Sequence, residues 1–386
     1  MAITTATRSG PLGLPVRRDA SAPWRHVDIG LLVTTLATAG MGLLMVHSAT
    51  QQKLAEAGLD PLTYVKRQAV WVMLGLVVMV AVMAIDYRVF RDLAPVLYAG
   101  TFALLLLVLS PIGTSTRGAQ AWFQFGSFQF EPSEWAKLAL VVCASTYCAT
   151  HRGDLDATRL GTVLLLAAVP MGLIYLQPDL GTDLVFGAIL AGVLVVAGAR
   201  PRHIVVLALL ATVAMFAVVQ LGVLKQYQLD RLSAFISPTS DPQRSSYNQE
   251  QSKTAIGAGG LTGKGLGKGT QTNLSFVPEQ STDFIFTVVG EELGFVGGLT
   301  LLILFAMVVW RTWRTATLSR DLYGTLVCVG VLAMFVFQIF ENMGMTMGIM
   351  PITGIPLPFM SYGGSATLAS FAAIGLVLNV HMRRFS

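Results

Sequence analysis

Six ionisable side chains lie within or at the ends of long apolar stretches of this sequence. They are Glu134, Lys137, Asp179, Asp183, Asp283 and Glu341. A charged side chain inside a membrane span costs roughly 2.5–3.5 kcal/mol on insertion scales, so it needs a partner or a function. Several carboxylates gathered with one lysine could perform general acid/base chemistry, bind a divalent cation or relay protons. The residues alone leave these three uses open.

The spacing of these residues predicts how helices present them. Asp283 stands where a polar segment becomes apolar, and we expect Thr282 to be the N-cap of a helix with Asp283 in its first turn. From this stretch alone, capping and catalysis carry equal weight for Asp283. Glu134 and Lys137, three positions apart behind an expected N-cap at Ser133, share a helix face and can form an ion pair.

Composition limits the class of protein. The chain has 386 residues, of which 54% are hydrophobic and 12% charged, which excludes a soluble globular fold. Its three cysteines lie in apolar stretches and predict neither disulfides nor a zinc site. The net charge of +5 comes from basic residues in short loops, which indicates membrane topology and not nucleic-acid binding.

The apolar stretches predict an all-α, polytopic membrane protein. Each is about twenty residues long, enough to cross ~30 Å of hydrocarbon. We predict a disordered cytoplasmic tail over residues 1–26, with no cleavable signal, followed by one membrane domain over residues 27–386. The ten predicted spans are 27–47, 68–85, 93–110, 133–150, 160–177, 182–199, 203–224, 283–310, 322–346 and 362–382.

The distribution of Lys and Arg predicts the orientation, with both termini in the cytoplasm. Fifteen arginines then face the cytoplasm, at positions 8, 17, 18, 25, 88, 91, 152, 159, 200, 202, 311, 314, 320, 383 and 384. The short loops on the other side hold four basic residues, Lys53, Lys66, Arg67 and Arg117. In this topology all six membrane-embedded charges lie at the extracytoplasmic ends of their helices, which predicts one polar cavity there.

Two irregular segments also fall on the extracytoplasmic side. The loop 225–282 has a Pro- and Ser-rich part, 237–247, that we expect to be mobile, and a Gly-rich part with Lys264 and Lys268. The Gly-rich part lacks the Ser or Thr of a nucleotide P-loop, and it either holds a phosphate or sugar or is a linker. The segment 351–364 carries three prolines and predicts a loop or re-entrant segment. Glu291 and Glu292 are interpreted as helix–helix hydrogen-bonding groups.

Several motifs, in one order along residues 27–386, resemble the shape, elongation, division and sporulation (SEDS) family. They are RGAQAWFQFGSFQFEPSEWAKLAL, QPDLGTDLVF, QSKTAIGAGGLTGKGLGKGTQ, VPEQSTDFIFTVVGEELGFVGG and GMTMGIMPITGIPLPFMSYGGSA. The PITGIPLPF form resembles the elongation branch more than the division branch. The chain departs from the family pattern at Ser281, Glu131 and Asp183, which would alter the polarity near the pocket without removing a core residue.

The resemblance implies a peptidoglycan glycosyltransferase of the cytoplasmic membrane. Such an enzyme polymerises lipid II at the outer face and releases undecaprenyl pyrophosphate. The family's essential aspartate carries over onto Asp283, and its other motif residues onto Glu134, Lys137 and Asp179. We expect Asp283 to deprotonate the acceptor sugar, and Lys137, held by Glu134, to neutralise the departing pyrophosphate.

Further site residues are predicted around this core. Arg117, Lys264 and Lys268 are candidate pyrophosphate or substrate ligands, and Asp179 with Asp183 could hold a divalent cation, Mg²⁺ or Mn²⁺. The supporting residues are Glu279, Glu341, Ser361, Tyr362, Gly363 and Gly364.

Two other functions stay open, a lipid II flippase and a non-catalytic scaffold of the elongation machinery. A flippase should carry charges across the whole membrane, whereas here they stop in the outer third. The resemblance also implies partners, namely a class B penicillin-binding protein transpeptidase and other elongation-complex membrane proteins, with no role for nucleic acid.

Overall fold

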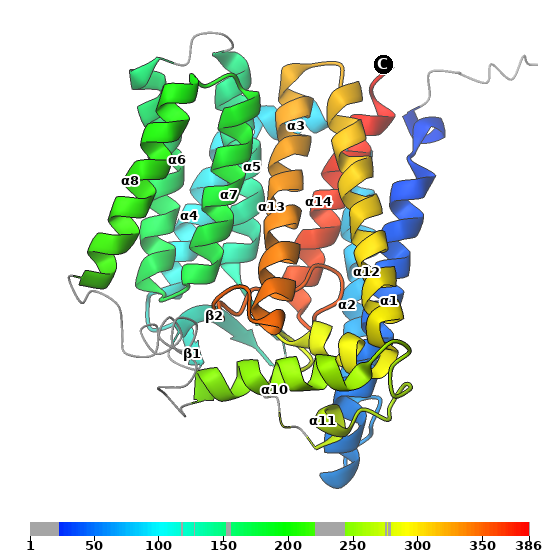
Figure 1. The fold of residues 1–386 in the computed structure, drawn as a ribbon. Coiled ribbons are helices and arrows are strands. Elements are labelled where there is room, and N and C mark those ends of the chain that lie inside the picture. The colour runs from blue at the N-terminus through cyan, green and yellow to red at the C-terminus, as the bar shows by residue number, and fades with distance from the viewer. Residues whose placement is uncertain are drawn as a thin grey trace, which may run out of the picture.

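The computed structural model describes residues 23–116, 119–126, 128–151, 156–220, 244–274, 276 and 279–385. Its long helices form one bundle along a common direction (Figure 1). They are α1 (Ile29–Glu56), α2 (Thr63–Ala84), α4 (Ala94–Val108), α5 (Pro132–Thr150), α6 (Ala157–Leu176), α7 (Leu180–Val196), α8 (Pro201–Gln220), α12 (Ile285–Leu318), α13 (Leu322–Met347) and α14 (Gly364–Met382). Shorter helices are η1 (Pro23–His26), α3 (Tyr87–Asp92), α10 (Arg244–Gly259) and α11 (Thr270–Asn273).

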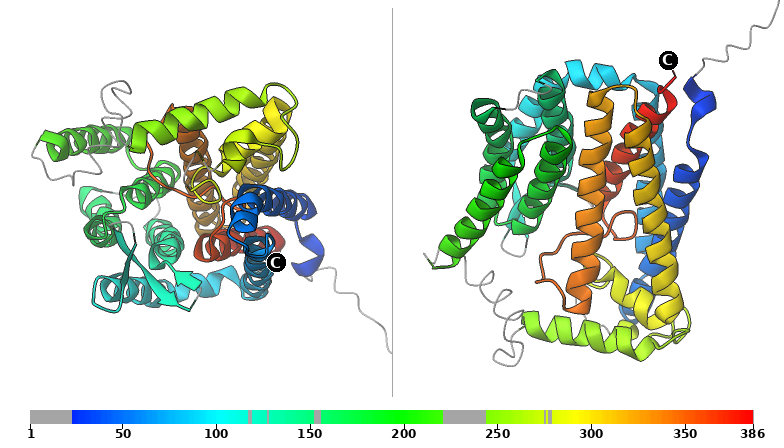
Figure 2. Two further views of the ribbon diagram at one scale, coloured as in Figure 1. Left: turned by 90° about the horizontal axis from the view of Figure 1, so that it is seen from below. Right: turned by 45° about the horizontal axis from the view of Figure 1, so that its top comes forward.

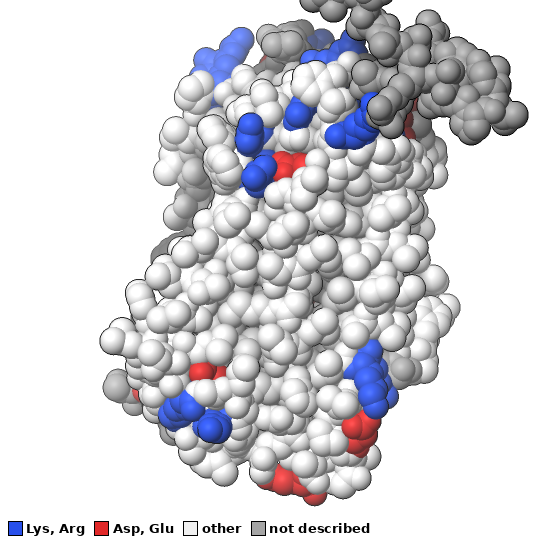
Figure 3. Space-filling view, turned by 90° about the vertical axis from the view of Figure 1, so that its right-hand side faces the viewer, with Lys and Arg blue, Asp and Glu red and all other residues white. Residues whose placement is uncertain are grey.

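Each predicted span overlaps one of these long helices. The predicted ends at 47 and 310 are too early, because α1 continues to Glu56 and α12 to Leu318. Among the described residues, six helices are long and apolar enough to cross a membrane, namely α1, α2, α6, α12, α13 and α14. On the face shown in Figure 3, charged side chains gather near the two ends and an uncharged band separates them. The chain is therefore a multi-pass membrane protein, while the count of ten spans stays a prediction.

The C-terminal helix α14 is the centre of the bundle. It is buried along most of its length and packs against α2, α13, α5 and α12. Helices α14 and α2 approach each other closely because each has a glycine at their contact. A Cβ at Gly375 would lie 2.9 Å from the carbonyl oxygen of Met79, and one at Gly75 would lie 2.5 Å from the ring of Phe371. Such small residues let helices approach each other within a membrane.

One end of the bundle carries a small β-sheet, which the predicted all-α fold did not include. Strands β1 (Thr114–Thr116), β2 (Ala119–Phe125) and β3 (Phe128–Phe130) form an antiparallel sheet in the order β1-β2-β3. Seen from this end, α10 lies along one edge and the sheet along another (Figure 2). We call this the sheet end. An all-α fold is thus incomplete, since the alternating AWFQF run pairs across a turn at Gly126.

The Gly-rich segment of the long loop supplies hydrogen-bond partners at a break in α12. At Gly294 the helix has φ 63° and its hydrogen-bond ladder is interrupted. Backbone amides of Lys264 and Gly265 donate to the carbonyls of Glu291 and Glu292, at 3.1 and 2.9 Å. In return the amides of Phe295 and Val296 donate to Gly260 and Leu261, at 2.9 and 3.0 Å. This segment is therefore a built part of the fold. Of the part expected to be mobile, 237–247, residues 237–243 lie outside the described residues, while 244–247 are instead the first residues of α10.

The two glutamates before the break hold the same segment by their side chains. Glu292 accepts from Ser48 of α1 at 2.5 Å, which confirms the predicted helix–helix contact. Glu291 instead accepts from Lys264 at 2.8 Å and from the backbone amides of Gln271 and Thr272 at 2.9 Å. It thereby satisfies the amides that open α11.

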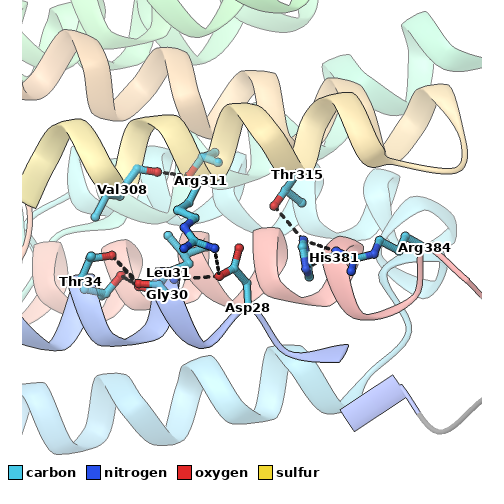
Figure 4. A network of polar contacts seen from close by, with 11 residues as sticks. Asp28, Gly30, Leu31, Thr34, Val308, Arg311, Thr315, His381 and Arg384 are labelled. Carbon is cyan, nitrogen blue, oxygen red and sulfur yellow. Dashed lines mark hydrogen bonds and ion pairs between the residues drawn. The ribbon is translucent and has the colours of Figure 1, made fainter. Parts of the chain in front are cut away.

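The opposite end of the bundle is joined by a second polar network (Figure 4). Asp28 caps α1 by accepting from the amide of Leu31 at 3.0 Å, and it pairs with Arg311 of α12 at 3.0 Å. Thr315 of α12 and His381 of α14 are 3.2 Å apart. These contacts fix α1, α12 and α14 against each other far from the sheet end.

Candidate active site

Asp283 lies in a tight turn at the sheet end, just before α12. The carbonyl of Glu279, a residue with φ 60°, accepts from the amides of Thr282, Asp283 and Phe284 at 3.1–3.2 Å. The helix starts at Ile285, and its N-cap Phe284 makes no side-chain cap. The predicted N-cap at Thr282 is wrong, because its hydroxyl turns back to Glu279 at 3.3 Å. Asp283 is thus held by a turn and not by the first turn of the helix.

The Pro-rich segment, residues 351–363, is a loop as predicted, and it lies against this turn. The amide of Tyr362 donates to the carbonyl of Ser281 at 2.8 Å, and the hydroxyl of Ser361 donates to that of Thr282 at 2.5 Å. Gly354 has φ 82°, and a Cβ there would lie 3.3 Å from Asp283 Oδ2. A glycine at this position therefore lets backbone approach the carboxylate.

A second group of charges stands at the start of α5. Lys137 Nζ and Glu134 Oε1 are 2.8 Å apart, and the two side chains are only 1% and 5% exposed. The predicted pair is therefore confirmed, and it is buried. Ser133 is not the N-cap, since α5 begins at Pro132 after an N-cap at Glu131. The Ser133 hydroxyl donates instead to Glu131 Oε1 at 2.7 Å.

Glu131 joins this group from the junction between β3 and α5. Its carboxylate also accepts from the indole of Trp122 at 3.1 Å. Burial, together with the charges of Glu134 and Asp179, raises the pKa of Glu131 to about 8. The raised pKa favours the protonated form of this carboxyl at pH values at which a free glutamate is ionised.

The start of α7 brings two more carboxylates to the same end. Asp179 is the N-cap, accepting from the amide of Thr182 at 3.0 Å, and Asp183 follows in the first turn. The Pro-rich loop connects this helix start with Asp283. A Cβ at Gly181 would lie 3.2 Å from the carbonyl of Thr353, and the next residue, Gly354, faces Asp283. The loop thus lies between the α7 start and the turn.

The other predicted site residues that the structure describes lie on α13, at the start of α14 and in the Gly-rich segment. Glu341 is fully buried in α13. Gly363 donates its amide to Gln68 at 3.2 Å, and a Cβ at Gly364 would lie 2.7 Å from the ring of Phe128. Lys264 is engaged with Glu291, and Lys268 is exposed in the Gly-rich segment. Arg117 lies outside the described residues.

Two site residues escaped the sequence analysis. Gln68 of α2 donates to the carbonyl of Ser361 at 3.3 Å and to Thr367 at 3.0 Å. Asn342 of α13 donates to the carbonyl of Asp283 at 2.8 Å. The signal was present, because amides within apolar spans are placed to hydrogen-bond between elements.

The described residues contain no group of three or more His, Cys, Asp or Glu side chains suited to a metal ion. Asp179 already spends one oxygen on its helix cap. Asp179 and Asp183 are a pair of carboxylates at one helix start. Two carboxylates are enough for Mg²⁺ when substrate phosphates and water complete its shell.

These features define a polytopic membrane protein with an acidic, loop-covered site at one end of its helical bundle. A family model described as "Cell cycle protein", covering FtsW, RodA and SpoVE, matches residues 29–385. The chain belongs to this family, the SEDS proteins.

Curated relatives match nearly the whole chain. Stage V sporulation protein E of Bacillus subtilis is 37% identical over 356 residues, covering 92% of this chain and 96% of that protein. Peptidoglycan glycosyltransferase MrdB of Escherichia coli K12 is 35% identical over 359 residues, covering 93% and 94%.

Solved structures share the fold. The rod shape determining protein RodA of Thermus thermophilus aligns with a TM-score of 0.70 at 31% identity, over 95% of this chain and 100% of that one. A chain of a peptidoglycan synthase complex, solved for its coordination of polymerization and crosslinking, aligns with a TM-score of 0.80 at 33% identity, over 94% and 100%.

Proposed function

We propose that this chain is a peptidoglycan glycosyltransferase that polymerises lipid II into β-1,4-linked glycan strands. Family membership supports the reaction class, and the relative from Escherichia coli is named a peptidoglycan glycosyltransferase. The observation that carries the site assignment is the turn around Asp283, whose carboxylate faces the backbone of Gly354 while its peptide is hydrogen-bonded on both sides.

In the proposed reaction Asp283 is the general base. It removes the proton from the 4-hydroxyl of the acceptor GlcNAc, and that oxygen attacks the anomeric carbon of the donor MurNAc. The bond from this carbon to the pyrophosphate breaks as the new bond forms, so the α-link becomes β and undecaprenyl pyrophosphate leaves. The proton stays on Asp283 until solvent removes it.

The departing pyrophosphate gains negative charge, which cationic groups stabilise. We assign this role to Lys137, which Glu134 holds in place. Asp179 and Asp183 are the residues that would hold a divalent cation, which would supply further positive charge to the phosphates when bound. Arg117 is a second proposed phosphate ligand.

The cellular setting is also proposed. Ten spans with both termini in the cytoplasm would place the sheet end outside, where lipid II is polymerised. The likeness to RodA supports a role in cell elongation, and the likeness to a chain of a synthase complex supports a class B penicillin-binding protein as partner.

The test uses the purified full-length chain in detergent or nanodiscs, supplied with lipid II, with the products resolved on a gel. We expect glycan polymer from the wild type and a loss of about two to four orders of magnitude in rate for Asp283→Asn. Asp60→Asn is the control, because Asp60 is an exposed acid in the loop between α1 and α2, paired with Lys66 at 2.6 Å.

Both alternative functions differ from the proposed one in this assay. A flippase forms no polymer from lipid II supplied on the outside. A scaffold forms none either, and Asp283→Asn then leaves complex assembly unchanged. Polymer at the wild-type rate from folded Asp283→Asn would remove Asp283 as the base. If EDTA leaves the polymerisation rate unchanged, the proposed role of a divalent cation is wrong.

A further inference from the structure

Three consecutive carbonyl oxygens in the turn before α12 are each hydrogen-bonded by a distant segment. Those of Ser281 and Thr282 accept from the Pro-rich loop, and that of Asp283 accepts from Asn342 Nδ2 at 2.8 Å. A turn that is held at every peptide has little freedom to move its side chain. The Asp283 carboxylate is therefore held in place from its backbone.

Asn342 makes two such bonds at once. Its side chain is fully buried in α13, and the same Nδ2 donates to the carbonyl of Ile355 at 2.7 Å. Both acceptors are carbonyl oxygens, which cannot donate, so the amide nitrogen must be the atom that faces them. Because Ile355 follows Gly354, this single amide joins the peptide that carries the acid to the loop that lies against its carboxylate.

The opposite end of the bundle contains a similar bridging asparagine, away from Asp283. Asn379 of α14 is fully buried, and its Nδ2 donates to the carbonyls of Val82 and Ile85 at 2.6 and 2.5 Å. Both asparagines thus brace a helix against the backbone of another segment. Only Asn342 has an acceptor in the Asp283 turn.

We infer that Asn342 is a positioning residue for Asp283, holding the base and the facing loop at a fixed separation; this rests on the proposed glycosyltransferase activity. Without the amide, the carbonyls of Asp283 and Ile355 lose their common donor and the turn can shift. A displacement of about 1 Å at a catalytic group can cost roughly 10²-fold in rate. Substrate binding elsewhere on the protein should change little.

The experiment compares Asn342→Leu with the matched control Asn379→Leu, in full-length protein with lipid II. Each variant removes a buried amide whose nitrogen bridges two carbonyls, so both should lower the thermal unfolding temperature. Asn379 Oδ1 also accepts from the amide of Tyr87 at 3.1 Å and from Arg383, so Asn379→Leu should lower it at least as much. Per folded molecule, we expect Asn342→Leu to reduce kcat by about 10²-fold with KM within about twofold, and Asn379→Leu to leave both unchanged.

A gentler variant covers the case in which Asn342→Leu does not fold. Ser361→Ala removes one donor from the neighbouring carbonyl of Thr282 and should lower kcat about tenfold at constant KM. Because both residues hold one turn, the double variant should lose less than the product of the single losses, whereas Ser361→Ala with Asn379→Leu should be multiplicative.

The outcomes separate this inference from the proposed function. If the wild type makes no polymer, the function is wrong and the inference falls with it. If the wild type is active and Asp283→Asn is not, but folded Asn342→Leu and Ser361→Ala keep the wild-type kcat, the function stands and the positioning role is overturned.

Discussion

Buried charge is managed differently at two neighbouring positions of the site. Glu134 is ionically paired with Lys137 in a nearly inaccessible place, whereas Glu131 is hydrogen-bonded by Trp122 and Ser133 and has a raised pKa. A paired carboxylate can remain charged when buried, but one that faces other carboxylates tends to keep its proton. We therefore expect removal of the Lys137 charge to destabilise the protein through Glu134, and a rise in pH to destabilise it through Glu131.

Glu131 should make stability fall as pH rises. Its pKa of about 8 lies above the ordinary value of 4.5, so between these pH values the folded state binds more protons than the unfolded state. The free energy of unfolding then decreases across that window and is lowest above pH 8. Glu131→Gln mimics the protonated form, and we expect a gain of roughly a few °C over the wild type at pH 9 but not at pH 5.

Thermal unfolding of the two proteins between pH 5 and 9 measures this difference. The ionisable groups around Glu131 are Glu134, Asp179 and Lys137, and all three are present in both proteins. Parallel curves for wild type and variant would mean that Glu131 does not titrate in this range.

The Glu134–Lys137 pair should show a large penalty for losing one partner. Lys137→Met leaves a buried carboxylate uncompensated, which costs about 3–5 kcal/mol in comparable pairs. Glu134→Gln together with Lys137→Met removes both charges, and we expect most of that stability to return while polymerisation stays impaired. Unfolding temperature and gel assay together distinguish a structural pair from one that contributes to activity: full activity of the double variant would make it structural.

At the scale of elements, the long helices were predictable and their connections were not. Apolar length located each helix, and Asp179 was expected at the start of α7, where it is the N-cap. The sheet joins strands that follow one another in the chain, and the alternating AWFQF run was a local signal for it. The hydrogen bonds across the break in α12 depend instead on contacts between segments far apart in sequence, such as Phe295 with Gly260, which no local pattern encodes. The wrong N-cap at Thr282 has the same origin, since the turn before α12 is shaped by the Pro-rich loop.

The break in α12 predicts a strong requirement for glycine. In Gly294→Ala the new Cβ would lie 2.3 Å from the amide nitrogen of Gly263, at a φ of 63°. We expect a loss of a few kcal/mol, about 2 or more, and release of the Gly-rich segment, detected as faster proteolysis after residue 259.

A matched control lies four residues further along α12. At Gly298 an added Cβ meets only the ring of Phe286, at 3.7–3.8 Å, so Gly298→Ala should leave proteolysis unchanged. Equal proteolysis of both variants would show that the break is not strained by a side chain.

At the scale of the whole molecule, the orientation in the membrane follows from charge and can be tested directly. The predicted topology places the α1–α2 loop outside and the end of α12 inside. Leu59 and Thr317 are exposed at these two places, and the three native cysteines are buried. A membrane-impermeant maleimide should label Leu59→Cys in intact cells, and Thr317→Cys only after the membrane is opened. The reverse pattern would invert the topology.

The sequence predicted which residues share the sheet end, but not how they are held. Ionisable residues in apolar helices are conspicuous, so Asp283, Glu134, Lys137 and Asp179 were identified. Neutral amides are less so, and Asn342 and Gln68 became visible only once their carbonyl partners were known. The positions of the site side chains depend on which backbone carbonyls the neighbouring amides bind. Those pairings are set by how the helices and loops pack together.

The exchange of hydrogen bonds between α12 and the Gly-rich segment makes them one cooperative unit. The amides of Lys264, Gly265, Phe295 and Val296 can be exposed to solvent only if both partners separate together, so their deuterium uptake should share a single opening rate. A molecule that binds the Gly-rich segment would then slow that opening. It would also slow the local unfolding of the residues that precede α12.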